Sequence, residues 1–134
     1  EGALEQAVSY AKERVQFGQS ISAFQAIQHK LADMAVRVET ARLLVYKSAW
    51  LADQKNVDKS VLAKLGAMAK YFAANAACNN ADDAVQIFGG MGFMEESGIP
   101  KRWRDSRILR LYEGTDEILK NGIAQILIKG SFLK

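Results

Sequence analysis

Apolar side chains recur at steps of three and four residues along most of this chain, which is the period of an amphipathic α-helix. The first such stretch runs from Gly2 to about Gln16, and Phe17-Gly18 follows it as a helix stop. The second runs from Phe24 to Gln54 without a break, which favours packing beside near-antiparallel helices. A second apolar stripe on this helix repeats every seven residues, at Val36, Leu43 and Trp50. Two stripes favour contacts on two sides, one within the domain and one open to another subunit.

A third long helix is predicted to begin after Asp58, a good N-cap residue, and to reach Phe88. The run Gly89-Gly90-Met91-Gly92 then breaks it, because glycine adopts backbone angles that other residues avoid. We expect the apolar side chains in and after this run, Met91, Phe93 and Met94, to pack against the helices.

The last third of the chain predicts two more helices, a short one from Lys101 to Arg110 and a final one from Thr115 to Lys129. No segment shows the two-residue period of a strand. The predicted fold class is therefore all-α, an antiparallel four-helix bundle.

Composition narrows the class of protein. The chain has 134 residues, is 49% hydrophobic and 25% charged, and is long enough for one domain with its own core. Cys78 is the only cysteine, so no internal disulfide can form, and we expect an intracellular origin and a packed thiol. No apolar run is long enough to cross a bilayer, and no signal peptide is visible. Because the sequence starts at Glu1 and enters a helix at once, we expect it to be a piece of a longer protein.

The stretch from Leu111 to Ile118 is the strongest candidate for chemistry. It places Glu113 between Tyr112 and Gly114, just before a helix for which Thr115 is a plausible N-cap. Asp116 and Glu117 would fall in the first helical turn, where the helix dipole favours negative charge. An aromatic neighbour and a glycine that admits a ligand are useful around a catalytic base, although an ordinary solvated loop glutamate would have the same local pattern.

Other clusters have simpler explanations. The only histidine, His29, has no glutamate three residues before it, so the paired motifs of a di-iron bundle are missing and no metal is predicted. Arginines and a lysine crowd the segment 101–110, but acidic residues nearly balance them, and the net charge is only +3. A salt-bridged helix, or attraction to a phosphorylated ligand, explains this segment better than a nucleic-acid site.

Two further segments could hold an anion or a flat ring. Arg14 lies three residues before Phe17, so a guanidinium and an aromatic ring would meet at a helix end. The segment from Gln86 to Gly90 offers an amide side chain beside bare backbone N–H groups, without the fingerprint spacing of a dinucleotide site. From the local pattern alone, a surface arginine and a core phenylalanine are the more ordinary explanation of the first pair.

Taken in order, several motifs resemble the C-terminal helical domain of acyl-CoA dehydrogenases. The motifs and their ranges are Arg14-Val15-Gln16-Phe17-Gly18, Phe24 to Gln28, Lys30 to Met34, Ala84 to Phe93, Trp103 to Ile108 and Tyr112-Glu113-Gly114-Thr115. They occur in the family's order and spacing and cover nearly the whole chain, so their joint occurrence is specific.

The resemblance implies an FAD flavoenzyme that removes the α-hydrogen of an acyl-CoA thioester as a proton and passes the β-hydrogen as a hydride to flavin N5, giving trans-2-enoyl-CoA. It implies that Glu113 is the catalytic base and that Gly114 leaves room for the substrate. Arg14 and Phe17 would contact an FAD that is bound mainly by a neighbouring subunit. Thr115 and Glu117 would contact the flavin of the chain's own active site. The full set of FAD contacts implied by the resemblance is Arg14, Gln16, Phe17, Gln25, Gln86, Gly89, Gly90, Thr115 and Glu117.

The resemblance also sets expectations beyond the site. Residues 1–134 would form the C-terminal domain, and the family's N-terminal helical and middle β-domains are absent from this chain, so the isolated chain is expected to be inactive. The implied partners are an electron-transfer flavoprotein as electron acceptor and further copies of the chain in a dimer or tetramer. The implied location is the cytoplasm of a bacterium or the mitochondrial matrix of a eukaryote. Two other hypotheses stay open, a non-catalytic binding or assembly module and a related acyl-CoA flavin oxidase.

Overall fold

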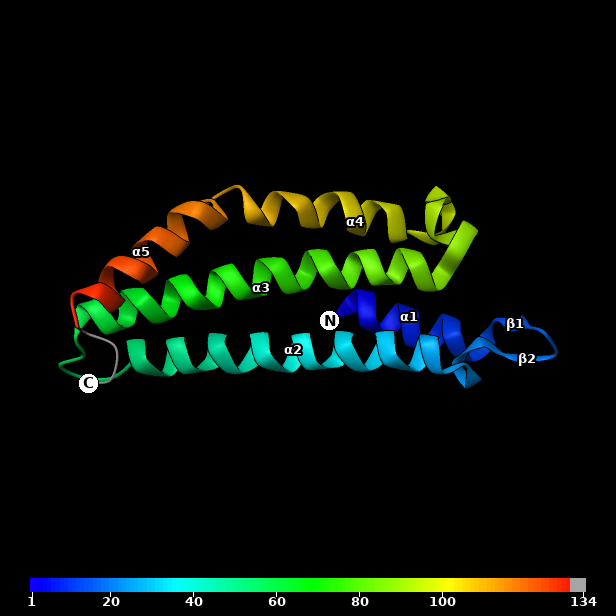
Figure 1. The fold of residues 1–134 in the computed structure, drawn as a ribbon, viewed down its shortest axis with the longest axis horizontal. Coiled ribbons are helices and arrows are strands. Elements are labelled where there is room, and N and C mark those ends of the chain that lie inside the picture. The colour runs from blue at the N-terminus through cyan, green and yellow to red at the C-terminus, as the bar shows by residue number, and fades with distance from the viewer. Residues whose placement is uncertain (131–134) are drawn as a thin grey trace.

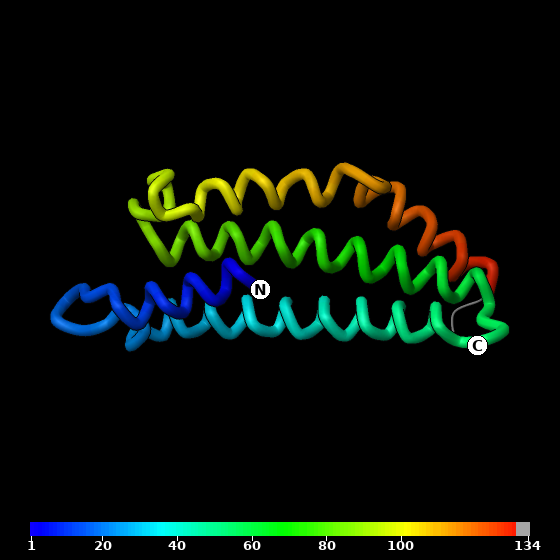
Figure 2. Tube along the Cα trace, turned by 180° about the vertical axis from the view of Figure 1, so that it is seen from behind, coloured from blue at the N-terminus to red at the C-terminus, as the bar shows by residue number. Residues whose placement is uncertain are grey.

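The computed structural model describes residues 1–130 of the chain as an extended helical bundle. Helix α3 (Lys59–Phe88) runs through the middle, with α2 (Gln25–Ala52) antiparallel along one side (Figure 1). On the other side α4 (Ile99–Arg107) and α5 (Asp116–Ile128) follow each other along α3. The short α1 (Gly2–Glu13) packs against α2 and α3 at one end of the bundle, as the view from behind also shows (Figure 2). The prediction of an antiparallel all-α bundle is confirmed.

Local chemistry explains where the helices begin. The Asp58 carboxylate accepts a hydrogen bond of 2.8 Å from the backbone N–H of Ser60, so it caps α3 as predicted. The Thr115 hydroxyl accepts one of 3.4 Å from the backbone N–H of Ile118 and caps α5 in the same way. Pro100 lies in the first turn of α4, where a missing N–H costs no helical hydrogen bond.

The end of the first helix differs from the prediction. Helix α1 ends at Glu13, and the next residues form a small antiparallel hairpin of β1 (Val15–Gln16) and β2 (Gln19–Ser20). Phe17-Gly18 is the two-residue turn of this hairpin, with φ of 53° and 80°. Positive φ at both central residues is the pattern of a type I′ turn, which matches the twist of the flanking strands. The expectations of a helix to Gln16 and of no strand are therefore wrong at this one place.

The core lies at the hairpin end of the bundle, where α1, α2, α3 and the start of α4 meet. Met34 and Ile99 are its largest fully buried side chains. The Tyr10 and Phe88 rings stack beside it with centroids 4.0 Å apart. Small residues on α1 and α3, such as Ala7 and Ala84, let these helices approach closely.

The segment after α3 does not pack as expected. Met91, Phe93 and Met94 are 46%, 81% and 49% exposed, so the prediction that they pack against the helices is wrong. Gly92 is the residue that approaches α3, because a Cβ at this position would lie 2.5 Å from the carbonyl oxygen of Val85. The backbone, and not the apolar side chains, makes the close contact here.

A polar cluster ties α2 to α3. Asp83 accepts hydrogen bonds of 2.7 Å from both Lys30 and Arg37. Arg37 also donates to the side-chain oxygen of Asn80 at 2.8 Å, and Asn80 donates to the carbonyl of Met34 at 3.0 Å. The salt bridges and burial of this cluster fix the register of the two long helices.

The apolar stripe on α2 that repeats every seven residues faces away from the bundle. Val36, Leu43 and Trp50 are 65%, 66% and 62% exposed. The first stripe, by contrast, contains the buried Met34 and the half-buried Ile27 and Leu31. The two stripes therefore lie on different sides of α2, and one of them has no cover from residues 1–130.

Candidate active site

Glu113 lies in the short connection between a 3-10 turn (Ile108–Arg110) and α5, as the sequence predicted. Its φ is 52° and that of the following Gly114 is 101°. A non-glycine residue rarely adopts positive φ, and such backbone strain gathers at functional sites. Among residues 1–130 only Phe17, Asn56 and Glu113 are non-glycine residues with positive φ, and two of these three are predicted site residues.

The Glu113 side chain is exposed to solvent, and the neighbouring Tyr112 is 47% exposed. The described helices thus present the carboxylate at the surface and do not enclose it. Gly114 is half-buried, and a Cβ there would lie 3.3 Å from the Leu119 side chain. A larger residue would crowd the first turn of α5 as well as strain the positive φ.

Two residues of α3 hold the turn around Glu113 by hydrogen bonds. The Lys70 ammonium donates a hydrogen bond of 2.7 Å to the carbonyl oxygen of Gly114 and lies 5.8 Å from the centroid of the Tyr112 ring. One turn further along, Asn75 donates to the Asp116 carboxylate at 3.1 Å. Lys70 and Asn75 were not predicted as site residues, because they lie about forty positions from the turn along the chain and come close to it only through the packing of α3.

Asp116 is the buried acid of this region, with 3% of its surface exposed. Burial acts to raise its pKa, but hydrogen bonds from Arg110 at 2.6 Å and from Asn75 outweigh burial and hold the pKa below its usual value. The neighbouring Glu117 is exposed, and hydrogen bonds from its own backbone N–H and from the Thr115 hydroxyl lower its pKa as well. Both acids therefore stay ionised in the first turn of α5, as its dipole favours.

The cationic segment before the turn is largely ion-paired. Lys101 pairs with Asp105, Arg104 with Glu95, and Arg110 with Asp116. This supports the prediction of a salt-bridged helix, and it shows Arg110 to be a structural partner of the candidate active-site turn.

A second group of predicted site residues lies at the hairpin end. Arg14, Gln16, Gly89 and Gly90 line one open cavity of about 580 Å³, which Tyr10 and Phe88 also border. A Cβ at Gly89 or Gly90 would meet no atom within 4 Å, so the backbone is open to a ligand.

An aromatic ring projects beside this cavity. Phe17 at the hairpin tip is 91% exposed and makes one edge-to-face contact with Phe24, with ring centroids 6.1 Å apart. Gln25 is the first residue of α2, directly after Phe24, and Gln86 is exposed in the last turn of α3. A cationic side chain, an exposed ring and bare backbone are the features that bind a diphosphate and a flat ring system.

The two groups do not meet within the chain. Lys70 lies on α3 beside the Glu113 turn, and Gly89 directly follows the last residue of α3. The two residues are nineteen positions apart, which corresponds to about 28 Å along a helix. Figure 1 shows the same separation, with β1 and β2 at one end of the bundle and the connection from α4 to α5 well along it. A single chain therefore places Arg14 and Phe17 far from Glu113, Thr115 and Glu117.

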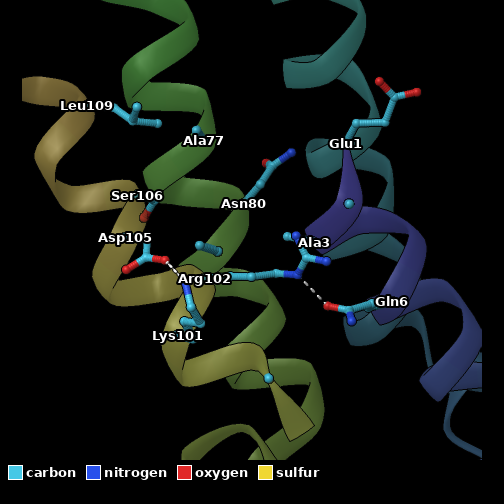
Figure 3. A pocket seen from close by; sticks show the side chains of 13 residues that line it. Glu1, Ala3, Gln6, Ala77, Asn80, Lys101, Arg102, Asp105, Ser106 and Leu109 are labelled. Atoms are coloured by element: carbon cyan, nitrogen blue, oxygen red, sulfur yellow. Dashed lines mark hydrogen bonds and ion pairs between the residues drawn. The ribbon is translucent and has the colours of Figure 1, made fainter.

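A larger cavity of about 660 Å³ between α1, α3 and α4 contains none of the predicted site residues (Figure 3). Four of the polar side chains that line it pair with one another, since Arg102 donates to Gln6 at 2.7 Å and Lys101 pairs with Asp105. We assign no chemistry to it.

Residues 1–130 contain neither a cluster of metal ligands nor a membrane-spanning helix. No group of three or more potential metal ligands comes together in this part of the chain. Within the same residues, no helix has the length and apolar character needed to span a membrane.

Comparison with known proteins identifies the family. The sequence model described as acyl-CoA dehydrogenase, C-terminal domain, matches residues 1–128. The probable acyl-CoA dehydrogenase YngJ of Bacillus subtilis (strain 168) is 46% identical over 129 residues, which cover 96% of this chain and 33% of YngJ. The chain belongs to the acyl-CoA dehydrogenase family, and the matched region is that family's C-terminal domain.

Two further relatives bear on chemistry and fold. The caffeyl-CoA reductase-Etf complex subunit CarC of Acetobacterium woodii is 42% identical over 130 residues, 96% of this chain and 33% of CarC. A solved FAD complex of PigA superposes with a TM-score of 0.88 at 34% identity, covering 93% of this chain and 32% of that one. The chain thus spans about a third of the length of these relatives.

Proposed function

We propose that this chain is the catalytic helical domain of an FAD-dependent enzyme that converts acyl-CoA thioesters to trans-2-enoyl-CoA, with Glu113 as the base. The observation that carries the proposal is the position of Glu113. Its carboxylate stands exposed on a strained turn, between an aromatic residue and a glycine and directly before a capped helix, in a chain of the acyl-CoA dehydrogenase family.

The chemistry explains why a glutamate is needed in this position. The α-proton of a thioester is weakly acidic, so its removal needs a positioned base, and a carboxylate covered by substrate is a stronger base than a solvated one. The backbone N–H of Glu113 is assigned to the thioester carbonyl, where it would stabilise the developing enolate, and Gly114 leaves room for the substrate. The chemistry that FAD supplies when bound is acceptance of the β-hydrogen as a hydride at N5.

The residues at the hairpin end fit FAD in chemical type. Arg14 supplies a cation for the diphosphate, Phe17 an exposed ring, and Gly89 and Gly90 an open backbone beside the cavity that Gln16 also lines. Gln25 and Gln86 flank the same end of the bundle. Thr115 and Glu117, by contrast, lie beside Glu113 and are assigned to the flavin of the chain's own active site.

The distance between the two groups supports a shared site. If one FAD is held by both, Arg14 and Phe17 must come from a second copy of the chain, because about 28 Å of α3 separates them from the Glu113 turn within one copy. The exposed stripe Val36, Leu43 and Trp50 offers an apolar surface for such assembly. We therefore propose a homo-oligomer, a dimer or a tetramer.

The electron acceptor proposed for this enzyme is an electron-transfer flavoprotein. A second candidate is the same chemistry run as reduction of a 2-enoyl-CoA, which the 42% identity to a caffeyl-CoA reductase subunit favours. The two directions use the same carboxyl group and flavin: Glu113 would act as base in the oxidation and as acid in the reduction, the flavin would accept or donate the hydride, and the redox partner would differ.

The test replaces Glu113 in the flavin-loaded full-length protein. Glu113→Gln keeps the shape of the side chain but removes the basic oxygen, so we expect flavin content to stay constant and the bleaching of the flavin by acyl-CoA to slow by roughly 10²–10⁴-fold, the usual contribution of a general base. Glu96→Gln, an equally exposed glutamate away from the turn, is the matched control and should be unchanged.

Anaerobic titration of the unmodified protein with saturated acyl-CoA thioesters of different lengths comes first. Bleaching by one length class supports the dehydrogenase and defines its substrate. Near-normal bleaching of the Glu113→Gln protein would remove Glu113 from the mechanism, and a flavoprotein that no acyl-CoA bleaches would remove the proposed reaction itself.

A further inference from the structure

Lys70 contacts both neighbours of Glu113. Its ammonium donates a hydrogen bond of 2.7 Å to the carbonyl oxygen of Gly114, on one side of the glutamate. The same ammonium lies 5.8 Å from the centroid of the Tyr112 ring, on the other side, within the range of a cation–π contact. Lys70 is half-buried on the central helix α3, so it reaches the turn from a rigid element.

The turn needs such support. Glu113 and Gly114 both have positive φ, and a glutamate leaves this conformation readily unless its surroundings hold it. The carbonyl of Gly114 also belongs to the peptide that leads into Thr115, the N-cap of α5. Fixing that carbonyl therefore fixes the orientation of the backbone from Glu113 to the start of the helix.

The other anchors hold the ends of the turn and not its centre. Arg110 and Asn75 both bind the buried Asp116 carboxylate, at 2.6 Å and 3.1 Å. Asp116 lies three residues beyond Glu113. Lys70 contacts the residues on both sides of Glu113, and the Tyr112 N–H also donates a backbone hydrogen bond of 3.2 Å to the Ile108 carbonyl.

We propose that Lys70 is a positioning residue that holds the Gly114 carbonyl and the Tyr112 ring so that the left-handed turn directs the Glu113 carboxylate at its substrate. Lys70 does not touch the reacting atoms and acts through Glu113, so this inference rests on the proposed function. A displacement of about 1 Å at a reacting group can cost on the order of 10²-fold in rate, which sets the size of the expected effect.

The experiment uses three variants of the flavin-loaded full-length protein. Lys70→Met removes the ammonium and keeps the length of the side chain, Lys70→Arg keeps a cationic donor, and Lys70→Gln keeps a neutral donor that is too short to reach. Lys59→Met is the matched control, because Lys59 is exposed at the start of the same helix, about 16 Å away along its axis.

Three quantities separate positioning from general packing. The first is the limiting rate of flavin bleaching after rapid mixing with excess acyl-CoA, which we expect to fall by about 10- to 100-fold in Lys70→Met. The second is the dissociation constant of the trans-2-enoyl-CoA product, followed by the flavin spectrum, which should change by less than about twofold because the pocket is kept. The third is amide hydrogen exchange of the peptide that contains residues 111–116, which should speed up in Lys70→Met and not in Lys59→Met.

Rescue completes the test. Lys70→Arg should restore most of the rate and the slow exchange, and Lys70→Gln should not. A bleaching rate in Lys70→Met equal to that of the unmodified protein overturns the positioning role and leaves the proposed function intact. Equal losses of rate and product affinity without rescue by arginine show a packing role and also overturn it.

Two remaining outcomes are equally decisive. If Lys70→Met does not fold, the comparison of Lys70→Arg with Lys70→Gln decides, and equal rates in these two overturn the positioning role. If no acyl-CoA bleaches even the unmodified protein, the proposed function falls and the role of Lys70 falls with it.

Discussion

Asp83 offers the sharpest test of how the two long helices are held together. Its two carboxylate oxygens each accept a hydrogen bond of 2.7 Å, one from Lys30 and one from Arg37. The Asp83 side chain is only 15% exposed, so it depends on these partners. Burial acts to raise its pKa, but the hydrogen bonds and charges of Lys30 and Arg37 outweigh burial and hold it below its usual value.

The size of the effect follows from these contacts. Asp83→Asn keeps the shape but removes the charge and turns one acceptor into a donor that faces a cation. A hydrogen bond to a charged group contributes about 1.5–3 kcal/mol. The two cations are 38% and 25% exposed, so water compensates part of the loss. We expect the free energy of unfolding to fall by about 2 kcal/mol.

The assay is urea unfolding followed by circular dichroism, with the midpoints compared at a common slope. Asp105→Asn is the matched control, because Asp105 makes the same kind of pair with Lys101, but both side chains are more than 60% exposed. An exposed pair one turn apart contributes less than about 0.5 kcal/mol. If Asp83→Asn lowers stability no more than Asp105→Asn, the cluster does not hold α2 against α3 and the argument fails.

Two other predictions concern acid and assembly. The pKa of Asp116 is lowered in the folded chain relative to its usual value of 3.8, mainly by Arg110 and Asn75 against burial, so its contribution to stability is fully present above that pH and is lost as the pH falls through the lower folded value. Thermal unfolding from pH 6 to pH 2 should therefore show a steeper loss below about pH 4 in the unmodified protein than in Asp116→Asn; equal slopes would contradict this. Leu43→Glu places a charge in the exposed stripe of α2, and light scattering should report a smaller assembly than for the unmodified protein, whereas an unchanged mass would place the interface elsewhere.

The long helices were predictable because their signals are local. The predicted limits of α2 and α3 agree with the structure to within one or two residues, and the N-caps Asp58 and Thr115 are at the expected positions. Side-chain caps and the three-to-four-residue period act within one or two turns, so the sequence carries them directly.

The hairpin after α1 was not predicted, for a physical reason. Each of its strands has two residues, too few to show a strand period, and a glycine after a helix is also a common stop signal. The outcome depends on Phe17, which accepts a positive φ although the residue type disfavours it. An exposed ring held in this conformation at the tip of a turn is a sign of function more than of stability.

The position of Glu113 before α5 was predictable, but its support was not. The sequence marks Tyr112, Glu113, Gly114 and Thr115 as neighbours and shows nothing of Lys70, which is forty-three positions before Glu113. Tertiary packing alone brings the ammonium of α3 under the turn. The proposed site thus has two parts, a local motif that would supply the carboxylate and a rigid helix that, as we propose, determines where the carboxylate points. A substitution in the first part should abolish the chemistry, whereas one in the second should slow it and leave ligand binding nearly unchanged.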